Sequence, residues 1–394
     1  MIDFPASPTL GQQFTAAGVT WTWDGVKWSA SGLSVAYLPL SGGSMSGPIV
    51  LAADPTANLQ AATKQYVDAA AAAVPVGIGS NRIINGDMRV NQRGAINGSA
   101  IVYTVDRWAY AATQATKITW SQTNGPPGFP YCLAGQSFGP YTALATDQFH
   151  FAQPIEADMV TDFAWGTPSA QPVTLSFWAS ANITGTFGGT LYNYPTPATR
   201  SYPFTFSIPV AGVWTKYTIT IPGDTVGTWV MTGNAATVGV SFDLGAGANF
   251  RGPAGAWVNA NLRGATGTVS IVASNGGALM LTGVKLEIGS VATPYNRQSL
   301  AKSLADCQRY YQSLAGNQML AIGNTSAGGL TYNTISYMTA MRANPTVTYS
   351  SVAYFNASAL AVNGASTTAL SNQINVTAAG QGYATGIVAL SAEL

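Results

Sequence analysis

The chain has a single histidine, which is the residue type that acts as the general base in serine and cysteine catalytic sites. His150 stands between Phe149 and Phe151 in a chain of 394 residues. A Ser-His-Asp triad would have to use this histidine, and we expect no strand-to-helix elbow that would supply a nucleophilic serine to it. A histidine between two aromatic residues is typical of a packed strand, so we predict a structural role for His150.

Four acidic residues form one cluster, and paired carboxylates could cleave a polysaccharide by acid–base chemistry. They are Asp147, Glu156, Asp158 and Asp162. Glu156 and Asp158 are two residues apart, so a strand would present both on one face. The alternative, which we favour, is a solvated loop near Pro154. The His, Cys and acidic residues show no metal-ligand spacing, and we predict no catalysis, no metal and no cofactor.

Charged residues are scarce. They make up 8% of the chain, whereas hydrophobic residues make up 47% and the formal net charge is +1. An average soluble domain has roughly 25% charged residues. This composition suits a rigid extracellular or virion protein better than a metabolic enzyme, although an ordinary secreted β-domain fits it too. The scattered Lys and Arg residues form no basic patch for nucleic acid.

The cysteines and the hydropathy pattern suggest a protein made in a reducing cytoplasm. Cys132 and Cys307 lie far apart in the sequence, and we expect buried thiols rather than a disulfide. Residues 1–5 lack the basic and apolar regions of a signal peptide. The apolar tract at residues 69–76 is too short to span a bilayer.

Near the N-terminus, two alternating runs flank an Asp-Gly pair. They are Val19–Trp23 and residues 26–28, with Asp24-Gly25 between them. Asp-Gly favours a two-residue hairpin turn, which would place Trp21 opposite Trp28.

A helical stretch follows Asp54-Pro55, with small and apolar residues at spacings of three and four. These residues are Leu59, Ala62, Tyr66, Ala69 and Ala73. The spacing is that of a coiled-coil seam. It lasts only about two heptads, below the number that identifies a coiled coil, so a single amphipathic helix is the alternative.

Period-two runs between Gly, Pro, Asn and Ser predict strands in the body of the chain. They cover residues 117–120, 173–178, 216–221, 237–242 and 279–286. Short strands at such spacing indicate a β-sandwich or jelly roll.

The C-terminal part has two further patterns. Residues 300–311 predict a connecting helix. Residues 335–338 and 346–349 predict strands on either side of a turn at 342–345, and so a small C-terminal β-domain.

Several motifs together resemble those of bacteriophage tail fibres. Residues 4–28 are similar to an N-terminal fibre module, and residues 37–49, Asp54-Pro55 and 62–68 are similar to a fibre repeat. The segments at 81–88, 103–108, 283–289 and 292–295 bracket a domain that resembles the fibre jelly rolls that are similar to carbohydrate-binding modules. The helix at residues 307–311 is a familiar continuation of such domains.

The resemblance implies a parallel homotrimer whose N-terminus faces the virion and whose distal parts bind a host glycan. The predicted fold is therefore mainly β, with an N-terminal β-hairpin module (1–31), a fibre repeat and short trimeric coiled-coil helix (32–80), a jelly-roll sandwich (81–298), and a helix with a small β-domain (299–394). Similar jelly rolls often hold a structural calcium through acidic residues of the closing strand. Residues 282–285 lack these acids, so we do not predict that calcium.

Glycans dock on exposed aromatic faces, because sugar C–H groups stack on π-systems. The glycan-binding candidates are aromatic residues in loop-like or strand-edge contexts: Trp165, Tyr192, Tyr194, Tyr202 and Trp229. Each of them could instead be structural. Trp178 and Trp214 lie within regular alternation, and we expect them in the core.

The combined prediction is a non-catalytic tail-fibre protein of a phage virion that attaches to the host surface. Its expected partners are its own copies, other tail or baseplate proteins at the N-terminal segment, and a host glycan, without nucleic acid or membrane insertion. The alternatives are a fibre-borne polysaccharide depolymerase and a fibre that decorates the head or baseplate.

Overall fold

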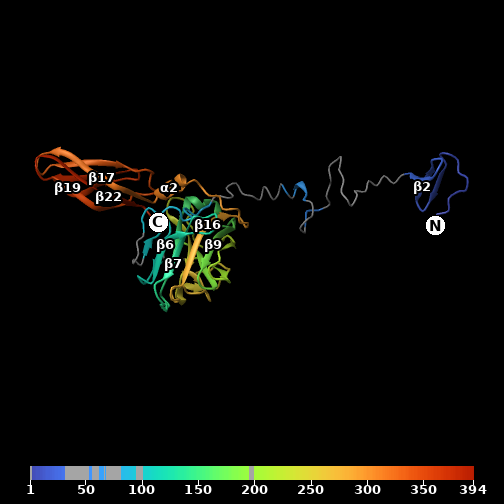
Figure 1. The fold of residues 1–394 in the computed structure, drawn as a ribbon, viewed down its shortest axis with the longest axis horizontal. Helices are drawn as coiled ribbons and strands as arrows, with labels where there is room; N and C mark the ends of the chain where they lie inside the picture. The colour runs from blue at the N-terminus through green and yellow to red at the C-terminus, as the bar shows by residue number, and fades with distance from the viewer. Residues whose placement is uncertain are drawn as a thin grey trace. The chain divides into compact units, whose positions relative to one another are not determined.

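The computed structural model describes residues 2–31, 53–55, 62–65, 67, 81–94, 101–194 and 199–394. The chain divides into two units, Met1–Ala73 and Val74–Leu394. The fold is mainly β, as predicted (Figure 1). Within the described ranges, no helix has the length and hydropathy needed to cross a bilayer. The boundaries of the four predicted ranges stay predictions.

The N-terminal unit contains a three-stranded antiparallel sheet rather than a hairpin alone. Its strands are β1 (Gln13–Ala16), β2 (Val19–Trp23) and β3 (Trp28–Ser31). Phe4 stacks on Trp28 with ring centroids 5.4 Å apart. Phe14 lies 5.5 Å from Phe4 and 6.0 Å from Trp28. The added strand and this aromatic cluster give the small sheet packing of its own.

The predicted pairing of Trp21 with Trp28 is wrong, because Trp23 lies opposite Trp28. The loop has four residues instead of two: the backbone N–H of Asp24 donates to the Lys27 carbonyl at 3.1 Å. The Asp24 carboxylate in turn accepts the Lys27 N–H at 2.8 Å. An aspartate that bonds the backbone in this way stabilises a longer turn, and each added loop residue moves the register.

The predicted coiled-coil seam falls almost wholly outside the described residues. Leu59, Tyr66, Ala69 and Ala73 are not described, and Ala62 is exposed. The trimeric helix therefore stays a prediction.

The second unit begins with a jelly-roll sandwich of two antiparallel sheets (Figure 1). In sheet order, the first is β11 (Ser201–Ile208), β10 (Gly185–Asn193), β13 (Ala236–Asp243), β8 (Phe149–Glu156), β5 (Ala109–Ala112) and β4 (Ile101–Tyr103). The second is β12 (Thr215–Ile221), β9 (Val173–Ala181), β16 (Ala278–Ile288), β7 (Tyr131–Ser137) and β6 (Ile118–Asn124). All five strands predicted for this region are present.

Aromatic side chains between the two sheets form the centre of the sandwich core. Phe177 of β9 meets Phe206 of β11 and Phe242 of β13, each with ring centroids 5.0 Å apart. All three rings are buried. Burial of one such side chain contributes about 1.5–3 kcal/mol, so these contacts between the sheets are a major part of the stability of the sandwich.

Short elements complete the sandwich. They are the 3₁₀ helices η1 (Ala157–Phe163) and η2 (Ala248–Phe250) and a parallel pair, β14 (Arg251–Gly252) with β15 (Gly264–Ala265). The helix α2 (Leu300–Gln308) follows. Its presence was predicted, but the predicted range of 300–311 is too long, because Tyr311 already begins a strand. The N-cap of α2 is Ser299, whose hydroxyl accepts the Lys302 N–H at 3.2 Å.

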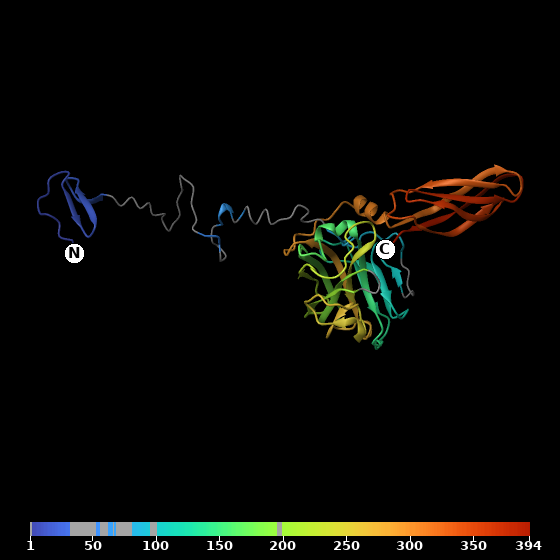
Figure 2. The ribbon, with the colours of Figure 1, turned by 180° about the vertical axis from the view of Figure 1, so that it is seen from behind.

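The C-terminal part consists of two three-stranded antiparallel sheets with a separate core (Figure 2). The first has β17 (Tyr311–Thr325), β22 (Gly380–Ser391) and β19 (Thr346–Phe355), in sheet order. The second has β18 (Leu330–Ser336), β21 (Ala369–Val376) and β20 (Ala357–Ala365). The strands predicted near residues 335 and 346 correspond to β18 and β19.

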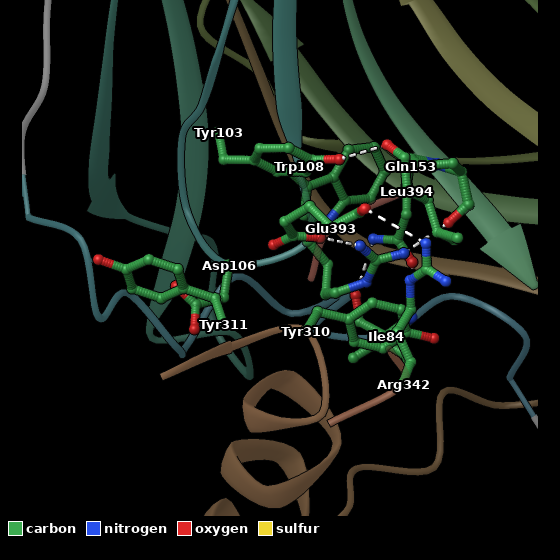
Figure 3. A network of polar contacts seen from close by, with 12 residues as sticks. Ile84, Tyr103, Asp106, Trp108, Gln153, Tyr310, Tyr311, Arg342, Glu393 and Leu394 are labelled. Atoms are coloured by element: carbon green, nitrogen blue, oxygen red, sulfur yellow. Dashed lines mark hydrogen bonds and ion pairs between the residues drawn. The ribbon is translucent and has the colours of Figure 1, made fainter. Parts of the chain in front are cut away.

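A buried charge network joins this C-terminal part to the sandwich (Figure 3). The Glu393 carboxylate pairs with Arg93 at 2.7 Å and also with Arg107. Arg107 donates to the Pro154 carbonyl at 2.7 Å and lies 3.5 Å from the centre of the Tyr310 ring. Its side chain is 1% exposed and that of Glu393 is 6% exposed. Asp106 lies 3.5 Å from Arg93 and supplies a second carboxylate, so the two positive charges are neutralised at the junction.

The same network accounts for strain at Arg107, whose φ is 72°. A left-handed backbone at such a residue costs on the order of 1–3 kcal/mol and persists only where the surroundings over-determine it. The ion pair with Glu393, the hydrogen bond to the Pro154 carbonyl and the contact with the Tyr310 ring hold Arg107 in this conformation.

We expect Glu393→Gln to lower the free energy of unfolding by about 3–5 kcal/mol, because it leaves the buried Arg107 guanidinium without a carboxylate and Arg93 with Asp106 alone, at 3.5 Å. Chemical denaturation measures this change. The control is Lys302→Gln, which removes an exposed i,i+4 pair with Asp306 and should cost about 0.5 kcal/mol or less. Equal effects of the two variants would contradict the role given to the network.

Candidate functional site

A shallow aromatic groove lies on the outer face of the five-stranded sheet. Its volume is about 360 Å³, and its walls include Phe129, Trp178 and Tyr295. The Phe129 ring lies 6.4 Å from Trp178 and 5.3 Å from Tyr295, measured between centroids. A second hollow of about 590 Å³ along residues 124–130 shares Phe129 with it. Three rings from distant parts of the sequence therefore form one surface.

A glycine in β16 lets these rings approach one another. Gly283 has a φ of 60°, and a Cβ at this position would lie 2.7 Å from Phe129 Cζ and 3.1 Å from Trp178 Cδ1. The register of β16 against β9 shifts between Thr282 and Lys285, so Gly283 lies within an irregularity of the ladder. Any other residue here would be strained and would push the rings apart.

Two cationic side chains border the groove. Lys216 lies opposite Trp178 in the ladder of β12 and β9, is exposed, and makes no ion pair with the described part of the chain. Arg297 lies 5.2 Å from the centre of the Phe129 ring and pairs with Asp87 at 3.1 Å. The groove therefore offers ring faces for apolar C–H surfaces and an ammonium group for hydroxyl or acidic substituents.

The five aromatic residues predicted to bind glycan lie elsewhere, in two internal clusters. Trp165 packs 4.8 Å from Trp229, and Tyr192 packs 5.6 Å from Tyr194. Trp165, Tyr192 and Tyr202 are buried and have no free ring face, so the structure argues against stacking on a sugar for these three. Trp229 and Tyr194 are half-buried, and for them the role stays a prediction.

The expectation that Trp178 and Trp214 lie in the core is wrong, since both are half-buried. The phase of the alternation explains Trp178. Leu175 and Phe177 are fully buried, and Trp178, which follows Phe177 directly, faces the opposite side of the strand. The sequence already contained this alternation, which would have placed Trp178 on the outer face. Nothing in the sequence placed Phe129 or Tyr295 beside it.

The outer face of the six-stranded sheet is covered by the loop between β13 and β16. Arg263 of this loop lies 4.1 Å from the centre of the Tyr192 ring, and Arg251 pairs with Asp243 at 2.9 Å. His150 lies opposite Asp243 in the ladder and is buried, so the predicted packed strand residue is confirmed. Burial, with the charge of Arg263, lowers the pKa of His150 to about 3.

The expectation that no Gly-x-Ser-x-Gly pattern would supply a serine is wrong for the sequence itself. The pattern Gly-x-Ser-x-Gly does occur, at residues 135–139. Ser137 ends the strand β7 and donates to the Gly139 carbonyl at 2.9 Å, and no helix follows it. His150 Nδ1 has no hydrogen-bond partner. The serine and the histidine therefore make no catalytic pair here.

The acidic cluster is not a solvated loop. Glu156 is buried at the end of β8, and Asp147 is buried and accepts the Tyr141 hydroxyl at 2.7 Å. Asp158 and Asp162 are exposed on η1. The prediction of a solvated loop is thus wrong for the first two acids, because each has bonding partners that a local sequence pattern does not reveal.

Both cysteines are free and buried, in agreement with the predicted thiols. Burial raises the pKa of Cys132 to about 12 and also raises the pKa of Cys307. Across the described residues, no group of three or more His, Cys, Asp or Glu residues could hold a metal ion.

No family model matches the sequence. Over 37 residues, 9% of this chain, the sequence is 62% identical to "Uncharacterized protein 091L" of Invertebrate iridescent virus 3, and the match spans 3% of that protein. So short a match leaves the activity of the chain open.

Solved structures similar to this chain include proteins named for sugar binding. The enzymatically active domain of tailspike protein 4 of bacteriophage CBA120 has a TM-score of 0.31 at 15% identity, over 53% of this chain and 21% of that one. A putative sugar binding protein of Bacteroides thetaiotaomicron has a TM-score of 0.32 at 13% identity, over 53% and 100%. A family 11 carbohydrate-binding module of Clostridium thermocellum has a TM-score of 0.27 at 9% identity, over 50% of this chain and 100% of that one. At such scores, the ligand of this chain must be argued from its own side chains.

We expect acidification from pH 7 to pH 5 to destabilise the fold through His150 by about 2 kcal/mol. The unfolded chain takes up a proton near the ordinary pKa of 6.5, whereas the folded chain does not until about pH 3. Stability from this group is complete above pH 6.5 and is lost as pH falls. In His150→Asn, denaturation at both pH values should show a smaller loss. The same loss in both proteins would refute this assignment.

Proposed function

We propose that this chain is a structural fibre subunit of a bacteriophage tail that forms a homotrimer and binds a host-surface glycan. The groove of Phe129, Trp178 and Tyr295 carries the glycan part of the proposal. It combines three half-buried aromatic rings with the exposed Lys216, an arrangement that suits a sugar ring with polar substituents. The unpaired ammonium group favours glycans that carry acidic substituents.

The distribution of charge in the C-terminal part supports self-association. From residue 310 to residue 394 the only charged residues are Arg342 and Glu393. Glu393 lies in the buried network, and Arg342 donates to the Asn234 carbonyl of the sandwich at 3.0 Å. The remaining surface thus has no charged side chain, while Leu330, Tyr332 and others on it are exposed.

A surface without charge suits contact with identical copies. Identical residues of the three copies meet at the threefold axis of a trimer, so like charges would repel there. In the proposed trimer, Leu59, Ala62, Tyr66, Ala69 and Ala73 form a helical seam. The N-terminal aromatic sheet would contact other tail or baseplate proteins. A head or baseplate fibre is the alternative location, which immunogold labelling of virions distinguishes.

We expect Trp178→Ala to weaken binding of host surface polysaccharide about tenfold or more, because it removes the central ring of the groove. Trp214→Ala is the matched control, since Trp214 is also half-buried but lies outside the groove. Titration calorimetry with purified polysaccharide measures both. Unchanged binding by Trp178→Ala would place the glycan site elsewhere. New reducing ends during incubation would instead favour a depolymerase.

We expect light scattering to give a mass of three times 40.7 kDa that does not change on dilution. Tyr332→Glu should shift the mass toward that of the monomer, because it places an unpaired charge in the uncharged contact between copies. The control is Phe138→Glu, which changes an exposed aromatic residue of the sandwich and should leave the mass unaltered. A monomeric wild-type protein would overturn the trimer.

A further inference from the structure

An irregular segment of the chain forms one wall of the aromatic groove. Residues 292–299 connect β16 to α2 and are irregular throughout. Tyr295 and Arg297 of this segment line the groove, where the Tyr295 ring lies 5.3 Å from the Phe129 ring. A strand is held by its ladder of backbone bonds, whereas an irregular segment opens more readily. The position of this wall therefore depends on contacts made by side chains.

A buried ion pair of β16 lies beneath the segment. Val284 and Leu286 belong to the core of the sandwich, so Lys285 and Glu287, which are out of phase with them, face the outer side of the sheet. The Lys285 ammonium and the Glu287 carboxylate pair at 3.0 Å, and their side chains are 1% and 0% exposed. Two opposite charges are thus enclosed on the sheet face that carries the groove.

Both members of the pair also bond to the segment. The Glu287 carboxylate accepts the Thr293 N–H at 2.9 Å and the Thr293 hydroxyl at 2.6 Å. The Lys285 ammonium donates to the Pro294 carbonyl at 3.2 Å and to the Thr293 hydroxyl oxygen. Each charge is therefore bonded to its counterpart and to the two residues directly before Tyr295.

A second anchor follows Tyr295 in the chain. Arg297 pairs with Asp87 at 3.1 Å and donates to the carbonyl of Gly128, the neighbour of Phe129. The Arg297 side chain is 36% exposed, so water screens this pair more than the enclosed one. Tyr295 thus lies between two anchored points, of which the Lys285–Glu287 pair is the better shielded.

The energetics of a buried ion pair indicate what the pair is for. Removal of both charges from water offsets most of their attraction, so an apolar pair of similar volume would contribute about as much net stability. Directed bonds to Thr293 and Pro294 are what the charged pair alone supplies. We propose that Lys285 and Glu287 are positioning residues of the aromatic groove, which hold Tyr295 beside Phe129 for a bound ligand. This inference rests on the proposed function for the ligand, a glycan.

The test replaces both charges at once in the full chain, by Lys285→Met together with Glu287→Leu, so that no buried charge is left unpaired. We expect the denaturation midpoint to stay the same or rise, whereas the backbone amides of residues 291–298 exchange with solvent at least tenfold faster. Hydrogen exchange followed by mass spectrometry measures this without any ligand. Titration calorimetry with purified host surface polysaccharide should then show binding at least tenfold weaker than that of the wild type.

The matched control is Lys302→Met together with Asp306→Leu, which removes an exposed ion pair from α2. It should leave both the exchange of residues 291–298 and the binding of polysaccharide unchanged.

Three results would overturn the positioning role. They are unchanged exchange of the segment in the Lys285 and Glu287 variant, a lowered midpoint with faster exchange throughout the sandwich, and faster exchange of the segment with unchanged binding of a polysaccharide that Trp178→Ala binds more weakly. A wild-type protein that binds no polysaccharide would contradict the proposed function instead, and the exchange rates would still decide whether the pair holds the segment.

Discussion

The pairing of Glu393 with Arg93 and Arg107 is the contact on which the arrangement of the second unit depends. Residues 286 positions apart, Arg107 and Glu393, meet where almost no water reaches them. Buried ions are costly unless each is paired and hydrogen-bonded, and here the carboxylate, a backbone carbonyl and the Tyr310 ring satisfy the guanidinium. The observed docking of the C-terminal sheets satisfies all of these groups together.

Because charged side chains are used in internal pairs, few unpaired charges are left on the exposed surface. Most charged side chains of the sandwich are held in ion pairs or hydrogen bonds, such as Arg200 with Asp224 and Lys285 with Glu287, both largely buried. The C-terminal part keeps no charge on its free surface. Recognition by such a surface has to rely on ring faces, neutral hydrogen bonds and shape, which is the chemistry of contacts with glycans and with identical copies.

The segment that connects β16 to α2 lines both the aromatic groove and a pocket beside α2. The segment contributes Tyr295 and Arg297 to the aromatic groove, and Tyr295 and Asn296 to that pocket. Meanwhile the loop between β13 and β16 covers the outer face of the other sheet, where Tyr192 and His150 are buried. The accessible features of the sandwich are therefore at one sheet face and at the junction with the helix.

Local patterns in the sequence determined five of the eleven sandwich strands, the helix at residue 300, the free thiols and the packed His150, because these depend on alternation, capping and polarity between near neighbours. The alternation also indicates that Trp178 points outward, because Trp178 is out of phase with the buried Leu175 and Phe177. Tertiary structure alone decided the rest. The four-residue turn at Asp24 moved the tryptophan register, Gly283 brought Phe129 to Trp178, and Arg309 paired with Glu156. These contacts join residues that no local period relates, so only the folded chain brings them together.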